Sequence, residues 1–455
     1  MKKYQCFPLV ILIILALNLS CKKYLDEKSD ASLVVPSTLA DFQNLMDDGG
    51  TMNVATPGIG TASADDYFID VSAYNSKAVF QQHVYKWMPY PYRYSNDWAL
   101  TYKAIYVANL CLERIVLVAR DTANAAAWDH MKGAALFYKA FYELEMAWLF
   151  AKAYDPATAE RDMGIVIRTG TDFTVRSERA SVAATYATIL QQAKAAAYLL
   201  PDKAIFATRA SKGAAYGLLA RTYLSMRQYD SAGKYANLAL GLNNVLMNYN
   251  EASLVSLNSS APFKLFNREV IFHSTMGSSI TLHHPSNGPA RIDTALYTFY
   301  DANDLRRKAF FVANSGYQRF KGSYSGNNSR LFSGIATDEM LLMRAESYAR
   351  AGDKTAALQD LNMLLEARFL TGNFIPVTAS NSQGALDIIL QERRKELIFR
   401  GSLRWMDVKR LNKEGREITM KRKIGTELFS IPPNDDRFAL QIPADVIELS
   451  GIQQN

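Results

Sequence analysis

Histidine is scarce in this chain, and the common catalytic motifs are missing. We find no His-Glu-x-x-His, no Gly-x-Ser-x-Gly, no phosphate-binding Gly-Lys-Ser/Thr loop and no Cys-x-x-Cys. The adjacent pair His283-His284 has no other ligand at a spacing that would complete a metal centre. We therefore expect no metal and no cofactor, and the missing motifs argue against most enzyme classes.

Acidic pairs leave a hydrolase as a weak alternative. Asp65-Asp66 and Asp435-Asp436 could in principle supply two carboxylates for acid–base work on a glycoside. The spacing of residues along the chain does not give the distance between their carboxylates. We expect a protein that is not an enzyme.

Long apolar runs are also missing, except at the start. Lys2 and Lys3 precede an apolar run at residues 7–17, and Cys21 follows shortly after. The run is too short to span a bilayer, which takes about 20 residues, but it suits a secretory signal. We expect a lipoprotein signal peptide at residues 1–20 and a lipid attached to Cys21. An ordinary signal with a coincidental cysteine stays an alternative, because Asn18 stands where lipoprotein signals usually carry an aliphatic residue.

Only three cysteines occur, namely Cys6, Cys21 and Cys111. Cys6 would leave with the signal and Cys21 would be acylated, so no internal disulfide can form. Cys111 lies in an apolar helical pattern, which favours a small buried side chain over a nucleophile.

Positive charge is in excess, with a formal net charge of +7. Residues 392–423 carry twelve Lys or Arg against five Asp or Glu. Such a stretch could meet an acidic partner, although a solvated helix face with internal ion pairs is the simpler interpretation. It carries no nucleic-acid motif, so we expect no nucleic acid as a partner.

Helical periodicity covers most of the remaining chain. The spacing of apolar residues predicts helices at 102–120, 131–154, 181–200, 212–226, 229–240, 337–351, 355–368 and 384–399. Two helix pairs share one pattern of separations, 3, 9, 4 and 3, and these are offsets typical of tetratricopeptide repeats. The residues are Ala220, Tyr223, Ala232, Ala236 and Ala239 in one pair, and Ala345, Tyr348, Ala357, Leu361 and Leu364 in the other. Residues 102–154 could form a third, looser pair. We predict a mostly α fold with a tetratricopeptide-like helical scaffold.

Two long stretches interrupt the helices, at about 48–97 and 243–328. They are rich in Gly, Ser, Asn and aromatic residues, and insertions of that length usually carry function or are disordered. Their tyrosines and tryptophans argue against disorder. We expect irregular, loop-rich insertions within a single domain at 21–455.

Aromatic residues gather between Tyr85 and Trp98. Aromatic rings beside polar groups suit a sugar, because sugar C–H groups stack on the ring while hydroxyls bond to the polar neighbours. Trp98, at the start of a helix, fits the core better, whereas we expect the rings at Tyr90, Tyr92 and Tyr94 to be exposed. A second candidate surface runs from His283 to Tyr300. The predicted ligand-binding residues are Trp87, Tyr90, Tyr92, Tyr94, Asn96, Arg291 and Tyr297.

Several motifs in order resemble those of one family. They are Cys21 with Leu25-Asp26, Trp98-x-x-x-Tyr102-x-x-Ile105-x-x-x-Asn109, Asp301-x-x-Asp304-x-Arg306, Arg344-Ala345-Glu346, and Glu392-Arg393-Arg394 through Arg404-Trp405-x-Asp407. Together they make the chain similar to the SusD/RagB-like outer-membrane lipoproteins of the Bacteroidetes.

This resemblance implies a lipid-anchored protein of the outer membrane that is exposed at the cell surface. It would bind an oligosaccharide without cutting it and deliver it to a SusC-like TonB-dependent transporter. The alternative function is a helical-repeat scaffold that binds a peptide or protein near Tyr223 or Tyr348.

Overall fold

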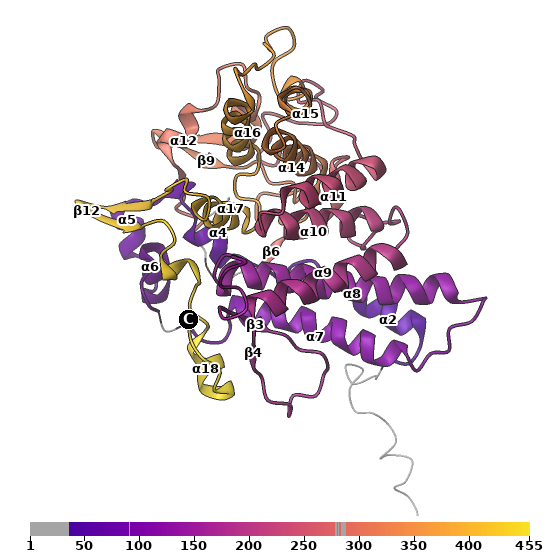
Figure 1. Cartoon of the computed structure of the whole chain (residues 1–455). Helices are drawn as coiled ribbons and strands as arrows, with labels where there is room; N and C mark the ends of the chain where they lie inside the picture. The colour runs from indigo at the N-terminus through magenta and orange to yellow at the C-terminus, as the bar shows by residue number, and fades with distance from the viewer. Residues whose placement is uncertain (1–35, 91, 278–279, 281, 284–287) are drawn as a thin grey trace, which may run out of the picture.

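The computed structural model describes residues 36–90, 92–277, 280, 282–283 and 288–455. The expected signal peptide, the lipid-attachment residue Cys21 and residues 284–287 of the second candidate surface lie outside the described residues. Helices dominate the described chain, and its strands form small two-stranded sheets (Figure 1). This agrees with the mostly α fold predicted above.

The helices have the following bounds: α2 Leu39–Met46, α3 Gly49–Met52, α4 Ile59–Ser63, α5 Val71–Asn75, α6 Val79–Lys86, α7 Asp97–Ile115, α8 Ala125–Phe150, α9 Val182–Leu199, α10 Lys212–Ser225, α11 Tyr229–Leu242, α12 Thr294–Thr298, α13 Arg306–Phe310, α14 Thr337–Arg350, α15 Lys354–Glu366, α16 Ser382–Glu396, α17 Leu403–Asn412 and α18 Ala444–Ser450. The strands are β1 Thr56–Pro57, β2 Tyr67–Phe68, β3 Met163–Val166, β4 Arg179–Ser181, β5 Val270–Phe272, β6 Met276–Gly277, β7 Arg291–Ile292, β8 Phe311–Asn314, β9 Tyr317–Phe320, β10 Ile335–Ala336, β11 Met420–Ile424 and β12 Glu427–Ile431.

All eight predicted helices are present, with shifted ends. Polar N-caps explain several starts: the side chains of Asn96, Ser181 and Ser211 each accept a hydrogen bond from the backbone of the first turn of α7, α9 and α10. Helix α8 ends at Phe150, before the expected Tyr154. The Nζ of Lys409 donates to the carbonyl oxygens of Trp148 and Ala151, both at 2.6 Å, and so satisfies backbone groups at that helix end.

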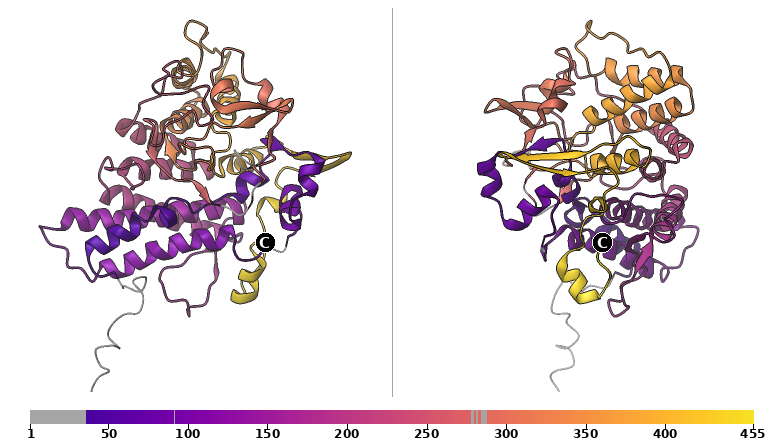
Figure 2. Two further views of the ribbon diagram at one scale, coloured as in Figure 1. Left: turned by 180° about the vertical axis from the view of Figure 1, so that it is seen from behind. Right: turned by 60° about the vertical axis from the view of Figure 1, so that its left-hand side comes forward.

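The scaffold is a row of neighbouring helices, in the order α7, α8, α9, α10, α11, α14, α15. Helices α11 and α14 pack together although 94 residues, 243–336, separate them in the chain. The two repeat pairs are therefore adjacent in space, and α7–α8 extends the same row (Figures 1 and 2). Stacking of this kind buries a continuous core between repeats.

The two insertions hold more regular structure than we expected. Residues 48–97 contain helices α3 to α6, and residues 243–328 contain five of the short strands with α12 and α13. The second insertion returns to the scaffold where β10 pairs antiparallel with β5, just before α14. Helix α17 and the β11–β12 hairpin were not predicted at all.

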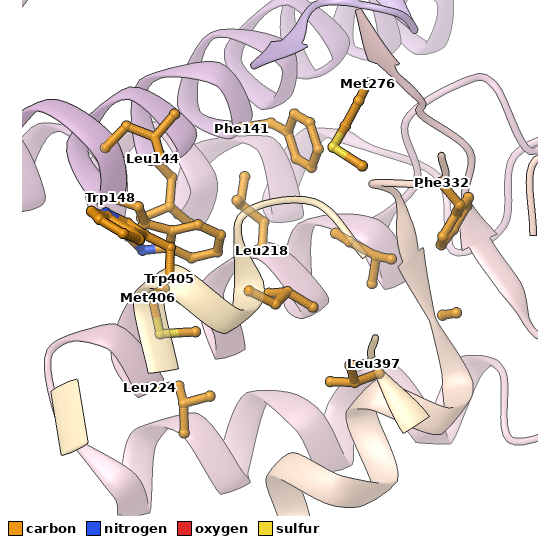
Figure 3. Close-up of a cluster of buried hydrophobic side chains, with 14 of the residues drawn as sticks. Phe141, Leu144, Trp148, Leu218, Leu224, Met276, Phe332, Leu397, Trp405 and Met406 are labelled. Atoms are coloured by element: carbon orange, nitrogen blue, oxygen red, sulfur yellow. The ribbon is translucent and has the colours of Figure 1, made fainter. Parts of the chain in front are cut away.

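The core lies where the scaffold meets the C-terminal elements. Figure 3 shows side chains from α8 and α10 facing Trp405 and Met406 of α17. Trp148 and Trp405 are among the largest fully buried side chains. The predicted core residues Trp98 and Cys111 are also buried, and burial raises the pKa of the Cys111 thiol to about 12.

The basic stretch 392–423 is largely neutralised inside the molecule, which confirms the interpretation as internal ion pairs. Eight of its twelve cations bind acidic partners: Arg393, Arg394, Lys395, Arg400, Arg404, Arg410, Lys413 and Arg416. Many of the motif residues quoted above belong to these pairs. Arg306, for example, binds Asp304, Glu392 and Glu396 at 2.7–2.9 Å with no exposure to solvent.

Candidate functional site

Helices α4, α5, α6 and α12 with the strand pairs β2–β7, β8–β9 and β11–β12 form a lobe on one side of the scaffold, which we call the side lobe (left in Figure 1). Its interior is aromatic: the ring of Tyr85 lies 6.0 Å from those of Tyr67 and Tyr74. The first and second insertions meet here, because β2 pairs with β7. The side lobe therefore carries both surfaces that the sequence indicated.

Arg422, from β11, holds this aromatic interior together. Its guanidinium donates to the carbonyl oxygens of Ala62, Ala64 and Tyr67. It also lies 4.3 Å from the centre of the Tyr67 ring and 5.5 Å from that of Trp87. A buried arginine enclosed by carbonyls and ring faces keeps its charge solvated by the protein.

The aromatic segment 85–98 is more buried than we predicted. Tyr90 and Tyr92 are both buried, so the expectation that their rings face solvent is wrong. Tyr92 stacks on Phe80 at 5.5 Å between ring centres, and its hydroxyl donates to Asp97. Burying a tyrosine ring removes a large apolar area from water, and here α6 and the C-terminal segment provide the cover.

Of the other predicted residues in this segment, two are buried and one is exposed. Trp87 is buried, and its indole N–H donates to the carbonyl of Ser63 at 2.9 Å. Asn96 is buried as the N-cap of α7. Only Tyr94 is exposed as expected, at 81%.

A shallow pocket opens beside this segment. It measures about 180 Å³ and is lined by Trp87, Met88, Tyr90, Arg437 and Gln441 among others. Its walls are mostly apolar. It could accept a small apolar group, but it is too small for an extended chain of sugars.

Arg291 and Tyr297 lie elsewhere in the side lobe. Tyr297, on α12, accepts a hydrogen bond from Arg307, whose guanidinium lies 4.9 Å from the tyrosine ring centre. Arg291, on β7, forms an ion pair with Asp70 at 2.8 Å. The segment around Trp87 and the second surface are therefore separate features that share one lobe.

Arg291 belongs to an arrangement that we call the strand-edge platform, formed by Phe68, Asp70, Arg291 and Tyr317. The guanidinium of Arg291 lies 5.2 Å from the centre of the Tyr317 ring. The Phe68 ring meets Tyr317 edge to face at 5.1 Å. Tyr317 is 38% exposed, and the side chain of Asp70 is 40% exposed.

The platform combines an accessible ring with a carboxylate and a guanidinium held in place. Such an arrangement can stack on the C–H face of a sugar while the charged pair bonds to its hydroxyls. Sequence reasoning found only Arg291 of the four residues. The sequence does hold a signal for Tyr317, because Ser315-Gly316 directly before it is a typical hairpin turn. Both turn residues have a positive φ in the structure.

The acidic pairs considered as catalytic groups are engaged in ion pairs. Asp65 binds Arg404 at 2.7 Å, and Asp66 binds Arg394 at 3.0 Å. Burial raises the pKa of Asp65, but Arg404 and Arg394 outweigh it and hold that pKa well below its usual range. In the second pair, Asp435 binds Arg437 and Asp436 binds Lys152, both at 2.8 Å.

Neither a metal-binding cluster nor a membrane-spanning helix occurs among the residues that the structure describes. No group of three or more His, Cys, Asp or Glu side chains in that part of the chain is placed to hold a metal ion. No helix there combines the length and the apolar character needed to cross a bilayer.

Two family models match the chain over most of its length. One, described as starch-binding associating with outer membrane, matches residues 23–224, and the other, described as the SusD family, matches residues 295–441. A SusD-like protein of Formosa agariphila is 40% identical over 80 residues, and this match spans 16% of each protein.

Solved structures share the fold along nearly the whole chain. A SusD superfamily protein from Bacteroides thetaiotaomicron has a TM-score of 0.73 at 22% identity, over 92% of this chain and 99% of that one. A SusD-like carbohydrate binding protein from Bacteroides vulgatus has a TM-score of 0.68 at 20% identity, over 91% and 97%. A laminarin-binding SusD-like protein has a TM-score of 0.66 at 19% identity, over 91% and 98%.

Proposed function

Because this chain belongs to the SusD/RagB-like family, we propose that it is a surface lipoprotein that captures oligosaccharides without cutting them. Acylated Cys21 would anchor it in the outer membrane. A SusC-like TonB-dependent transporter would receive the captured glycan. The family models and the carbohydrate-binding names of structural relatives support this proposal.

The observation that carries the proposal is the strand-edge platform. Tyr317 offers an accessible ring, and Asp70 with Arg291 offers a fixed pair of hydrogen-bonding groups beside it. We assign the main glycan contacts to these residues. Tyr297 would contact a neighbouring sugar unit, while the buried Trp87, Tyr90, Tyr92 and Asn96 would support the lobe from inside. Tyr94 is bonded to α18 and has no part in this site.

Affinity is expected to be modest. One stacked ring contributes about 1 kcal/mol, so a few rings with polar contacts give a Kd between about 1 μM and 1 mM. Weak binding suits capture followed by release to a transporter.

Titration of the purified protein with a glycan panel tests the proposal. The panel includes laminarin and starch oligosaccharides, and calorimetry measures the heat of binding. Tyr317→Ala is expected to weaken binding about fivefold or more, which corresponds to about 1 kcal/mol. The matched control is Tyr198→Ala, since Tyr198 is an exposed tyrosine on the scaffold helix α9 and its loss is expected to leave the Kd unchanged.

Three outcomes would count against the proposal. No binding to any glycan would remove its basis, and release of shorter products would indicate a hydrolase. If both variants weakened binding equally, the platform would not be the binding site.

The scaffold alternative meets a structural obstacle at one of its two positions. Tyr223 is buried and stacks on Tyr235 with an interplanar angle of 4°. A peptide that bound at this ring would first have to open the helix pair.

A further inference from the structure

Three projecting segments present apolar side chains to solvent. Phe173 and Val175 stand at the tip of the loop between β3 and β4, exposed at 91% and 58%. Leu449, on α18, is 89% exposed, and α18 buries none of its residues. Tyr94, in the segment before α7, is the third exposed tip.

These segments lie together on one side of the molecule. Asp445 of α18 accepts a hydrogen bond from the backbone N–H of Tyr94 at 2.9 Å, and Arg93 pairs with Glu448 at 2.6 Å. Arg179, at the base of the β3–β4 loop, donates to the carbonyl of Gln453 at 3.1 Å. The loop and α18 project downward in all three views of Figures 1 and 2. We call this side the tip face.

The apolar tip of the β3–β4 loop is held outward by polar contacts. Arg168 donates to the carbonyl oxygens of Asp172 and Val175, on both sides of Phe173. The Asp172 carboxylate accepts from the N–H and the hydroxyl of Thr174. Keeping the phenylalanine side chain in water costs free energy, because its apolar area is not buried. A partner that covers the side chain would recover that free energy.

The start of the described chain points to the partner. The first described helix, α2, lies in the lower half of the molecule in Figure 1, the half from which the β3–β4 loop and α18 project. Fourteen residues, 22–35, separate the start of the described chain from Cys21. Fully extended, they reach about 50 Å at about 3.5 Å per residue. A lipid on Cys21 would therefore lie within about 50 Å of the start of the described chain, which is short enough to let the tip face reach a bilayer.

We propose that the tip face rests on the membrane surface, with Phe173, Val175 and Leu449 inserted among the lipid headgroups. This proposal rests on the lipid anchor of the proposed function. Separate protruding tips suit a bilayer, because a fluid surface closes around each tip without matching its shape. Apolar side chains gain free energy at this depth, while the paired Arg93, Asp445 and Glu448 stay in water behind them.

Site-directed labelling of the full acylated protein tests the orientation. Phe173→Cys, Leu449→Cys and, as control, Ile375→Cys each receive a fluorescent label. Ile375 is 83% exposed on the loop between α15 and α16, on the opposite side of the molecule in Figure 1. The native Cys111 is buried and does not compete for the label. The labelled proteins are inserted into phosphatidylcholine vesicles with or without nitroxide-labelled lipids.

Nitroxide lipids are expected to quench the labels at 173 and 449 several-fold more than the label at 375. Equal quenching at all three positions would overturn the membrane-facing orientation. Quenching at none, with protection of position 173 only when the transporter is present, would also overturn it and identify the transporter as the partner. Mass spectrometry of Cys21 separates the two proposals, since a missing acyl group would remove the anchor itself.

Discussion

Two buried glutamates on scaffold helices have opposite pKa shifts. For Glu145, on α8, burial and the nearby Glu339 outweigh Arg221 and raise the pKa to about 7. For Glu346, on α14, burial also raises the pKa, but Arg410 and Arg350 outweigh it and lower the pKa to about 2. Both side chains are almost fully buried, so their partners decide the sign.

We therefore expect Glu145→Gln and Glu346→Gln to change stability in opposite directions at pH 8. The folded pKa of Glu145 exceeds its unfolded value of about 4.5, so its contribution to stability is present below pH 4.5 and is lost as the pH rises through 7. Replacing it should raise the free energy of unfolding at pH 8, by at most about 3 kcal/mol. Urea unfolding at pH 4, 6 and 8 measures the effect.

Glu346 behaves in the reverse sense. Its folded pKa lies below the unfolded value, so its stabilisation is present above pH 4.5 and is lost as the pH falls through 2. Glu346→Gln removes the carboxylate that pairs with the buried Arg410 at 2.6 Å and leaves that arginine with Asp407 alone. It should cost roughly 3–5 kcal/mol at pH 8. Two variants that shift stability in the same direction would contradict this account.

Single residues could be predicted where helical spacing decides their environment. Cys111 and Trp98 lie on helix faces whose apolar neighbours recur at three and four residues, and both are buried as predicted. Tyr90 and Tyr92 lie in an irregular segment, where local sequence does not say which way a ring points. The partners that bury them include Phe80 and residues near Gln441, far along the chain.

Among the elements, the contact between α11 and α14 is close enough to depend on a glycine. A Cβ atom added at Gly233 would lie 2.2 Å from the Oγ of Ser347 and 2.5 Å from its Cβ. Both repeat pairs were recognisable from their spacing, because the buried faces of their helices need small residues. Their adjacency was not, since the length of the 94-residue connection says nothing of where the chain returns.

Gly233→Ala should therefore force α11 and α14 apart and lower stability by about 1–3 kcal/mol. Gly241→Ala, on the same helix, is the matched control, because its Cβ would meet nothing within 4 Å. That variant should be neutral or more stable by up to about 1 kcal/mol, since alanine favours the helix. Denaturant midpoints compare the two, and a Gly233→Ala protein as stable as the control would show that the helices separate freely.

The β11–β12 hairpin shows why some elements were missed. Met420, Arg422 and Ile424 alternate with exposed Lys421 and Lys423, and Gly425 takes the positive φ of the turn. A strand pattern is thus present. We did not recognise the pattern because its central inward-facing residue is Arg422, and an arginine in a basic stretch is usually expected to face solvent.

At the level of the whole molecule, buried ion pairs join the second insertion to the scaffold. Arg368 binds Glu269 of the insertion at 2.9 Å and Glu396 of α16 at 2.8 Å, and all three are fully buried. The motifs that resemble the family supply a second such link, because Arg306 of the insertion binds Glu392 and Glu396 of α16. Their presence in the sequence therefore indicated the fold, while the variable loops that would hold a ligand carried a weaker signal.

We expect the protein to unfold in one calorimetric transition, as predicted for a single domain at 21–455. Arg368→Met should lower stability by roughly 3–5 kcal/mol, because it leaves Glu269 buried without a cation and leaves Glu396 with Arg306 alone. The control Arg416→Met removes a pair with Asp387 that is largely solvated and should cost less than about 1 kcal/mol. Two separate transitions in the unaltered protein would contradict the single domain.

The position of Arg422 has a consequence for the order in which the chain assembles. Its guanidinium closes the side lobe on the carbonyl of Tyr67, which lies 355 residues earlier. Because the polypeptide is synthesised from its first residue onward, residues 62–87 are made long before the arginine that completes them. The lobe that presents the strand-edge platform is therefore finished only when nearly the whole chain has been made, and until then its aromatic interior lacks the guanidinium that satisfies the carbonyls of Ala62, Ala64 and Tyr67.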